Sequence, residues 1–116
     1  MTRAVSGAAG AGHVAGVAAI AAAVRDGRTT AVGVTRALLE RITALDLTQS
    51  GFVAVDAEGA LARARDLDAT RAAGRLAGPL HGVPVGLKDL LFVRGLPNTC
   101  GTALPDYWTA GEDCTV

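Results

Sequence analysis

The chain is short and balanced in charge, and both properties limit what it can be. Its 116 residues allow at most one small domain, 50% of them are hydrophobic, and the formal net charge is zero. Binding to nucleic acid or to an anionic membrane needs a clustered basic surface, so the composition predicts neither partner. Cys100 and Cys114 have neither metal-ligand nor Cys-x-x-Cys spacing. We therefore expect reduced thiols in the cytoplasm, with no metal and no cofactor.

Residues 1–13 form an Ala/Gly-rich tract that we interpret as a flexible extension. A signal peptide is disfavoured because the tract lacks leucine and phenylalanine and runs without a break into a helical pattern. The spacing Gly10-x-Gly12-x-x-x-Gly16 is close to a dinucleotide-binding fingerprint, but no hydrophobic strand precedes it. The folded part is therefore expected over residues 14–116.

Two helices are expected next, as a hairpin whose function is packing. Apolar residues recur at helical spacing over residues 14–25, and Gly27 suits the end of that helix. Thr29 or Thr30 can cap a second helix that runs to about Leu45. Its apolar stripe comprises Val34, Leu38, Ile42 and Leu45.

A strand–helix–strand unit should follow the hairpin. Phe52–Val55 has the composition of a short strand, and a helix over Ala57–Ala73 is ended by Gly74. Val83–Leu87 alternates apolar residues with glycine and proline, which is typical of a second strand. A βαβ unit places both strands in one sheet covered by the helix. The fold class is thus expected to be α/β, an N-terminal helical hairpin followed by a βαβ unit. The inward positions of the expected helix are Ala60, Leu61, Ala64 and Leu67.

Several charged pairs on the expected helices are interpreted as solvent-exposed side chains without a role in a site. Arg36 and Glu40 lie one turn apart on a solvated face. Asp66 and Asp68 are two residues apart, so on a helix they point in different directions and cannot act as paired carboxylates. Both belong to an outward face of mixed charge, together with Arg63, Arg65 and Arg71.

Lys88 follows the second expected strand and is the only lysine, because the other ten basic residues are all arginine. Arginine carries positive charge at least as well but cannot lose its proton, whereas a desolvated lysine can. The neighbouring glycine and proline leave room for a ligand. Two interpretations stay open: a buried lysine that acts as a general base, or a structural lysine whose stem covers apolar surface.

A loop punctuated by glycine and proline, residues 94–102, leaves the expected strand where α/β proteins place their sites. Thr99, Gly101 and Thr102 are candidates to bind a substrate there, although hydroxyl side chains also form turns. His81 has no evident partner and is interpreted as a hydrogen-bonding loop or core residue. Residues 112–116 are expected to begin another helix.

Three segments together resemble the first part of the amidase signature family. They read Gly-Pro-Leu-His-Gly-Val-Pro-Val-Gly-Leu-Lys-Asp (78–89), Gly-Leu-Pro-Asn-Thr-Cys-Gly-Thr (95–102) and Glu-Asp-Cys-Thr-Val (112–116). The resemblance begins at about Ala18 and is looser before Leu76. It implies a mixed-sheet α/β/α fold, of which this chain would be an incomplete piece. It also implies that Lys88 is the general base of a Ser–cis-Ser–Lys triad. The family usually has Gly-Ser where this chain has Gly101-Thr102, a departure that keeps the hydroxyl.

The chain has no segment that could supply the serines of that triad. Its only serines are Ser6 and Ser50, and neither has a Gly-Ser-Ser context. One hypothesis is therefore an N-terminal portion of an amidase, or of the A-type subunit of a glutamine-dependent amidotransferase, truncated before the nucleophile and inactive alone. Its partners would be a small-molecule amide and the remaining enzyme portion or amidotransferase subunits. The other hypothesis is a non-catalytic module with a packing or interaction role. The sequence chooses neither the amide nor the oligomeric state.

Overall fold

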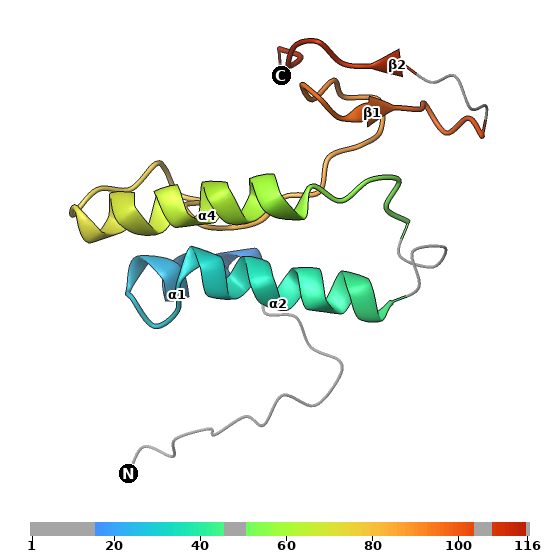
Figure 1. Ribbon diagram of the computed structural model, residues 1–116. Coiled ribbons are helices and arrows are strands. Elements are labelled where there is room, and N and C mark those ends of the chain that lie inside the picture. The colour runs from blue at the N-terminus through green and yellow to red at the C-terminus, as the bar shows by residue number, and fades with distance from the viewer. Residues whose placement is uncertain (1–15, 46–50, 104–107, 116) are drawn as a thin grey trace.

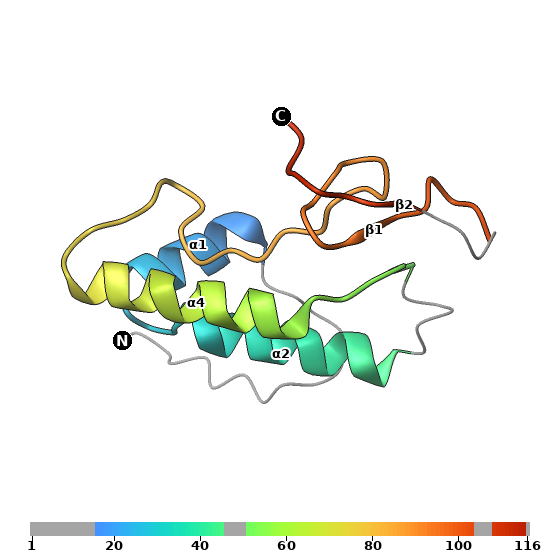
Figure 2. The same cartoon turned by 45° about the horizontal axis from the view of Figure 1, so that its top comes forward.

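The computed structural model describes residues 16–45, 51–103 and 108–115, and it shows a small helical layer followed by a two-stranded sheet (Figure 1). The elements are, in chain order, α1 (Val17–Arg25), α2 (Ala31–Ala44), α4 (Ala57–Ala72), β1 (Pro97–Asn98) and β2 (Trp108–Thr109). α2 and α4 pack side by side in opposite directions, and the sheet lies beyond one end of this pair (Figures 1 and 2). None of the described helices has the length and apolarity needed to cross a bilayer. The predicted extension over residues 1–13 lies outside the described residues.

Gly27 and Gly74 end α1 and α4, as the sequence predicts. Their φ angles are +73° and +74°, in the left-handed region that glycine adopts without a Cβ clash. Each glycine donates its N–H to the carbonyl three residues before it, and the next residue donates to a carbonyl five residues before itself. This pattern satisfies carbonyls that the helix end would otherwise leave unpaired.

The first three amides of α2 are all paired, and two of them bind a distant carboxylate. The Gly33 N–H donates to the Thr30 hydroxyl oxygen at 2.9 Å, which confirms the expected cap. The N–H groups of Ala31 and Val32 donate to the two carboxylate oxygens of Asp68, at 2.8 and 3.1 Å. The negative charge of Asp68 also suits the positive end of the helix dipole. The interpretation of Asp68 as a solvated surface residue is therefore wrong, because it ties α4 to the start of α2.

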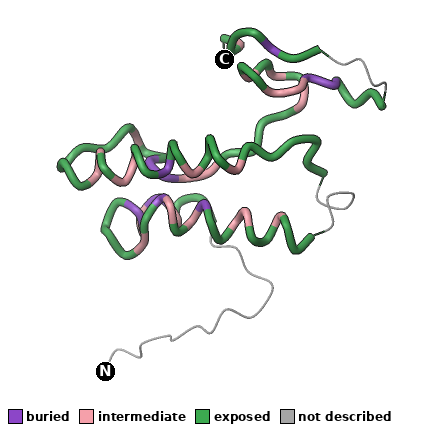
Figure 3. Tube along the Cα trace, viewed as in Figure 1, coloured by how far each residue is buried: buried purple, intermediate pink, exposed green. Residues whose placement is uncertain are grey.

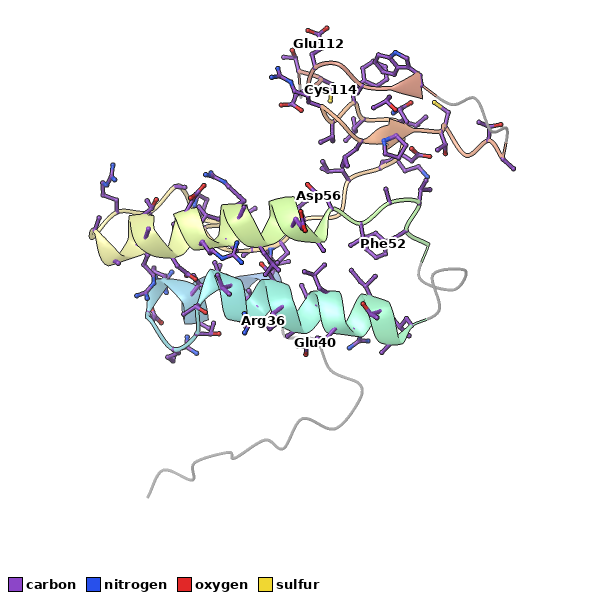
Figure 4. All side chains as sticks on the ribbon, in the orientation of Figure 1. Arg36, Glu40, Phe52, Asp56, Glu112 and Cys114 are labelled. Atoms are coloured by element: carbon purple, nitrogen blue, oxygen red, sulfur yellow. The ribbon has the colours of Figure 1, made fainter. Side chains whose placement is uncertain are left out.

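The outward face of α4 is only partly as predicted. Asp66 and the first two arginines are exposed, but Arg71 is half-buried and its guanidinium lies beside Gly27. Of the four positions predicted to point inward, Ala64 is buried and the two leucines are half-buried, whereas Ala60 is exposed. Arg36 and Glu40 are exposed on the face of α2 turned away from α4, as expected (Figure 4).

The core of the helical layer is built from small side chains, and Figure 3 shows its buried positions near the turn between α1 and α2. Val24 is 0% exposed, and the alanines buried with it are Ala21, Ala31 and Ala64. Gly82 packs directly on this core with a φ of +77°. A Cβ at Gly82 would lie 2.8 Å from a methyl carbon of Val24 and 3.1 Å from the Ala31 Cβ. The absence of a side chain at Gly82 lets the segment after α4 return across the helices.

Neither segment of the expected βαβ unit forms a strand, so that part of the fold prediction is wrong. Residues 52–55 and 83–87 are irregular, and the sheet instead pairs Pro97 with Thr109 and Asn98 with Trp108, antiparallel. A strand needs a neighbouring backbone, and in the described chain neither segment has one. The apolar residues that alternate over 83–87 therefore do not form a buried face. Val85, in the middle of the segment, is 68% exposed. The two helices of the expected hairpin do form, as α1 and α2, but the helices that pack against each other along their length are α2 and α4.

The last described residues run along residues 92–98 instead of beginning a helix. The N–H of Gly95 donates to the carbonyl of Ala110 at 2.8 Å, and the N–H of Cys114 donates to the carbonyl of Phe92 at 2.9 Å. The rings of Phe92 and Trp108 meet edge to face with centroids 4.6 Å apart. The expectation of a helix at residues 112–116 is thus wrong over 112–115, where the backbone is irregular and the Cys114 amide pairs with Phe92 instead of with a residue one turn before it.

Candidate active site

A cleft of about 450 Å³ opens around Lys88. Its walls come from the segment before α4, which carries Phe52 (Figure 4), from the irregular segment after residue 86, and from the turn that follows β1. Lys88 and Asp89 are the charged side chains among the described residues of this wall, and most of the others are apolar or glycine. An apolar hollow with a few polar groups is the usual form of a small-molecule site.

Lys88 lies at the cleft but is exposed to solvent, so the burial that the general-base interpretation assumes is not found in the described chain. The reason is the missing sheet, because no strand flanks residues 83–87 and nothing in the described chain covers the lysine. Its carbonyl accepts from the Leu91 N–H at 2.9 Å, which turns the chain immediately after it. Leu87 and Leu90 are 57% and 58% exposed. The wall of the cleft on either side of Lys88 therefore carries uncovered apolar side chains.

Asp89 faces the turn after β1 and receives hydrogen bonds from it. Its carboxylate accepts from the Thr99 N–H at 2.9 Å, from the Thr99 hydroxyl, and from the Gly101 N–H at 3.3 Å. These bonds favour the charged carboxylate and lower the pKa of Asp89, with the Thr99 hydroxyl the largest cause and the Thr99 N–H the next. Burial opposes this shift, and the Gly101 N–H and the charge of Lys88 add to it.

The turn itself is tightly formed. Cys100 and Gly101 have φ angles of +51° and +77°, so the chain takes two successive left-handed residues. The Gly101 N–H also donates to the Thr99 hydroxyl oxygen at 3.2 Å, and the Thr102 N–H donates to the Thr99 carbonyl at 2.9 Å. The Cys100 thiol donates to the side-chain oxygen of Asn98 at 3.1 Å. Cys100 and Gly101 both line the cleft as a result.

The structure separates the three predicted substrate-binding candidates. Gly101 lines the cleft, whereas Thr99 and Thr102 do not. Thr99 is only 5% exposed, and its hydroxyl is engaged by Asp89. Sequence reasoning gave Asp89 no role, although its position beside Lys88 and before a glycine-containing turn was a usable signal.

His81 is a structural residue, as interpreted. It is 4% exposed and does not line the cleft. Its Nδ1 accepts from the Ala77 N–H at 2.9 Å, and its Nε2 lies 3.0 Å from the Leu67 carbonyl oxygen. Because Nδ1 accepts, the ring hydrogen is on Nε2 and is donated to Leu67. His81 thus fastens the segment after α4 to that helix.

The cleft offers a basic amine but no hydroxyl nucleophile among the described residues that line it. In the described ranges, no three histidine, cysteine or carboxylate side chains come together as metal ligands would. Among the groups in this wall, the Lys88 amine could transfer a proton to or from a group brought into the cleft, and the Cys100 thiol and the Asp89 carboxylate lie in the same wall.

Comparison with known proteins finds the family model described as Amidase over residues 33–116. The A subunit of the glutamyl-tRNA(Gln) amidotransferase of Salinispora tropica is 46% identical over 99 residues, which are 85% of this chain and 20% of that protein. The corresponding protein of Acidothermus cellulolyticus is 46% identical over 97 residues, 84% of this chain and 19% of that one. The chain thus spans about a fifth of the length of these relatives.

One solved structure also matches with a TM-score of 0.74 and 31% identity. It is an inhibitor-bound complex described as a vestigial protein complex that reveals the evolutionary origins of an s-triazine catabolic enzyme. The match covers 84% of this chain and 21% of the solved chain. At this similarity the described fold is that of a segment found within a longer polypeptide.

Proposed function

Because this chain belongs to the amidase family, we propose that it supplies the general-base lysine of an enzyme that hydrolyses carboxamide C–N bonds. The observation that carries the proposal is the position of the chain's single lysine in the wall of a mostly apolar cleft. The family resemblance assigns the base role to the same residue.

In the proposed reaction, Lys88 acts on a serine that the rest of the enzyme supplies. The unprotonated amine accepts, through a bridging cis-serine, the proton of the serine hydroxyl that attacks the amide carbonyl. The proton is then returned to the departing ammonia or amine, and water hydrolyses the acyl-enzyme. This chemistry requires the amine to be covered, and the exposed Leu87 and Leu90 beside it offer apolar surface for such a cover.

Among amides, we favour the side-chain carboxamide of glutamine. The relatives at 46% identity are A subunits of glutamyl-tRNA(Gln) amidotransferases, and amido transfer needs an amide that releases ammonia. The partners of this chain would then be the remainder of such an A-type polypeptide and the other amidotransferase subunits.

The proposal predicts that the chain alone releases no ammonia from amides and that the same chain, placed inside a full-length relative, does. The 116-residue chain should release no ammonia from glutamine or from simple amides, because base and nucleophile act as a unit. A chimera in which the whole chain replaces the matching region of the Salinispora tropica protein should release it, and Lys88→Ala should lower that rate roughly 10²- to 10⁴-fold.

A matched control is Arg36→Ala, which removes an exposed cation from the face of α2 turned away from α4. It should leave the rate of the chimera unchanged. An active chimera that is indifferent to Lys88→Ala would refute the base role and would favour the second candidate, a non-catalytic module. The exposure of Lys88 in the isolated chain is the observation that favours that second candidate.

A further inference from the structure

The residue next to Lys88 has a set of contacts that the proposed reaction does not by itself explain. Asp89 turns its carboxylate to the turn after β1 and accepts two backbone N–H groups and one hydroxyl from it. These partners are 10 and 12 residues further along the chain. Asp89 therefore joins the lysine-bearing segment to a separate part of the cleft wall.

The turn needs such an anchor because of its backbone geometry. Cys100 has a φ of +51°, and a residue with a Cβ is strained in that region. The neighbouring Gly101 is also left-handed, and its N–H points to the Asp89 carboxylate and to the Thr99 hydroxyl. Hydrogen bonds to a charged carboxylate are stronger than those to a neutral acceptor, so they can hold this conformation.

We infer that Asp89 is a positioning residue, which holds the turn of residues 98–102 in place as the part of the cleft wall next to Lys88. The consequence for catalysis rests on the proposed function: with the turn held, Cys100 and Gly101 border the space in which an amide would meet the lysine. Thr99 also helps to hold this turn, because its hydroxyl donates to the Asp89 carboxylate and accepts from the Gly101 N–H.

Hydrogen exchange of the 116-residue chain tests the anchor without any assay of activity. In Asp89→Asn, a peptide that covers residues 98–103 should exchange at least about tenfold faster, because an amide side chain has one acceptor oxygen instead of two. Thr99→Val should accelerate the same peptide, and Thr99→Ser, which keeps the hydroxyl, should restore slow exchange. A peptide from α2 should be unaffected in each variant.

Glu112→Gln is the matched control, because it also removes one negative charge, from an exposed side chain near the end of the chain (Figure 4). It should leave exchange of residues 98–103 unchanged. An Asp89→Asn variant with exchange within twofold of the parent chain would overturn the inference, as would an equal acceleration in the Glu112→Gln control.

Kinetics of the chimera then separate the anchor from the base. Asp89→Asn should lower kcat roughly ten- to a hundredfold with a smaller change in KM, as expected for a displaced wall, and Thr99→Ser should stay near the parent rate. If exchange accelerates but kcat does not change, a role in positioning the reaction is refuted. If Lys88→Ala is harmless, the proposed function fails, while the exchange experiment still decides whether Asp89 holds the turn.

Discussion

The helical layer and the cleft region differ in how their side chains are covered. In the helical layer, Val24 is fully buried, Asp68 pairs the first amides of α2, and Gly82 fits against the core. In the cleft region, Val85, Leu87 and Leu90 are each more than half exposed, and the turn after β1 is held by hydrogen bonds to the Asp89 carboxylate. Large apolar side chains are exposed in both regions, since Val17 of α1 is 56% exposed, but a fully buried large apolar side chain such as Val24 is found in the helical layer. The two regions should respond differently to mutation.

The largest expected effect is that of Gly82→Ala on the helical layer. The new Cβ would lie 2.8 Å from a methyl carbon of Val24, and the φ of +77° is strained for alanine. Overpacking and left-handed strain together should lower the free energy of unfolding by about 3 kcal/mol. Urea unfolding followed by circular dichroism at 222 nm measures this change.

Gly86→Ala is the control for that substitution in the cleft region. Its nearest neighbour would be a ring carbon of Phe52 at 3.8 Å, an ordinary contact. It should change the unfolding free energy by less than about 0.5 kcal/mol. Equal effects of the two substitutions would mean that the core is not packed around Gly82.

A smaller effect is expected from Asp68→Ala, which leaves the Ala31 and Val32 amides without their acceptor. The loss should be about 1–2 kcal/mol, in the range measured for helix caps. Asp66→Ala removes an exposed carboxylate from the same helix and should cost less than about 0.5 kcal/mol. Similar unfolding midpoints for the two variants would contradict the assignment of Asp68 as an anchor between helices.

The smallest effect is local and depends on pH. The pKa of Asp89 is lowered below its ordinary 3.8, so its hydrogen bonds contribute fully above that value and are lost as pH falls through the lower folded value. Exchange of residues 98–103, corrected for the intrinsic pH dependence, should therefore accelerate only below about pH 4. The pKa of Asp26 is also lowered, by hydrogen bonds from Arg28 and Arg25, so exchange must be measured at residues 98–103 and not over the whole chain. Acceleration that begins near pH 6 would exclude Asp89 as its cause.

The sequence predicted the helices better than the strands because helical signals are local. The helices, the Thr30 cap and the glycines at 27 and 74 depend on neighbouring residues, and they are confirmed. The predicted apolar faces are confirmed only in part, because Ala60 is exposed and Leu45 lies past the end of α2 and is 45% exposed. The strand predicted at 83–87 depended on a neighbouring backbone that this chain does not provide, so alternation alone was misleading.

The sequence predicted those parts of the site that single residues mark, and it missed those that depend on contacts between distant residues. Lys88 and Gly101 are single residues marked by their type and motif, and both line the cleft. The anchoring roles of Asp68 and Asp89 depend on partners 37 and 10 residues away, and spacing along one element cannot show such contacts. Thr99 was predicted to bind substrate because it carries a hydroxyl, but that hydroxyl donates to Asp89. The residue does not line the cleft.

The most direct test of the account is chemical rescue of Lys88→Ala in the chimera by a small amine. If Lys88 acts by accepting a proton, added methylamine should raise ammonia release in proportion to its free-base concentration, and Lys88→Arg should stay inactive because arginine keeps its proton. Full activity of Lys88→Arg, or a Lys88→Ala rate that does not respond to the amine, would contradict the assignment of Lys88 as the general base.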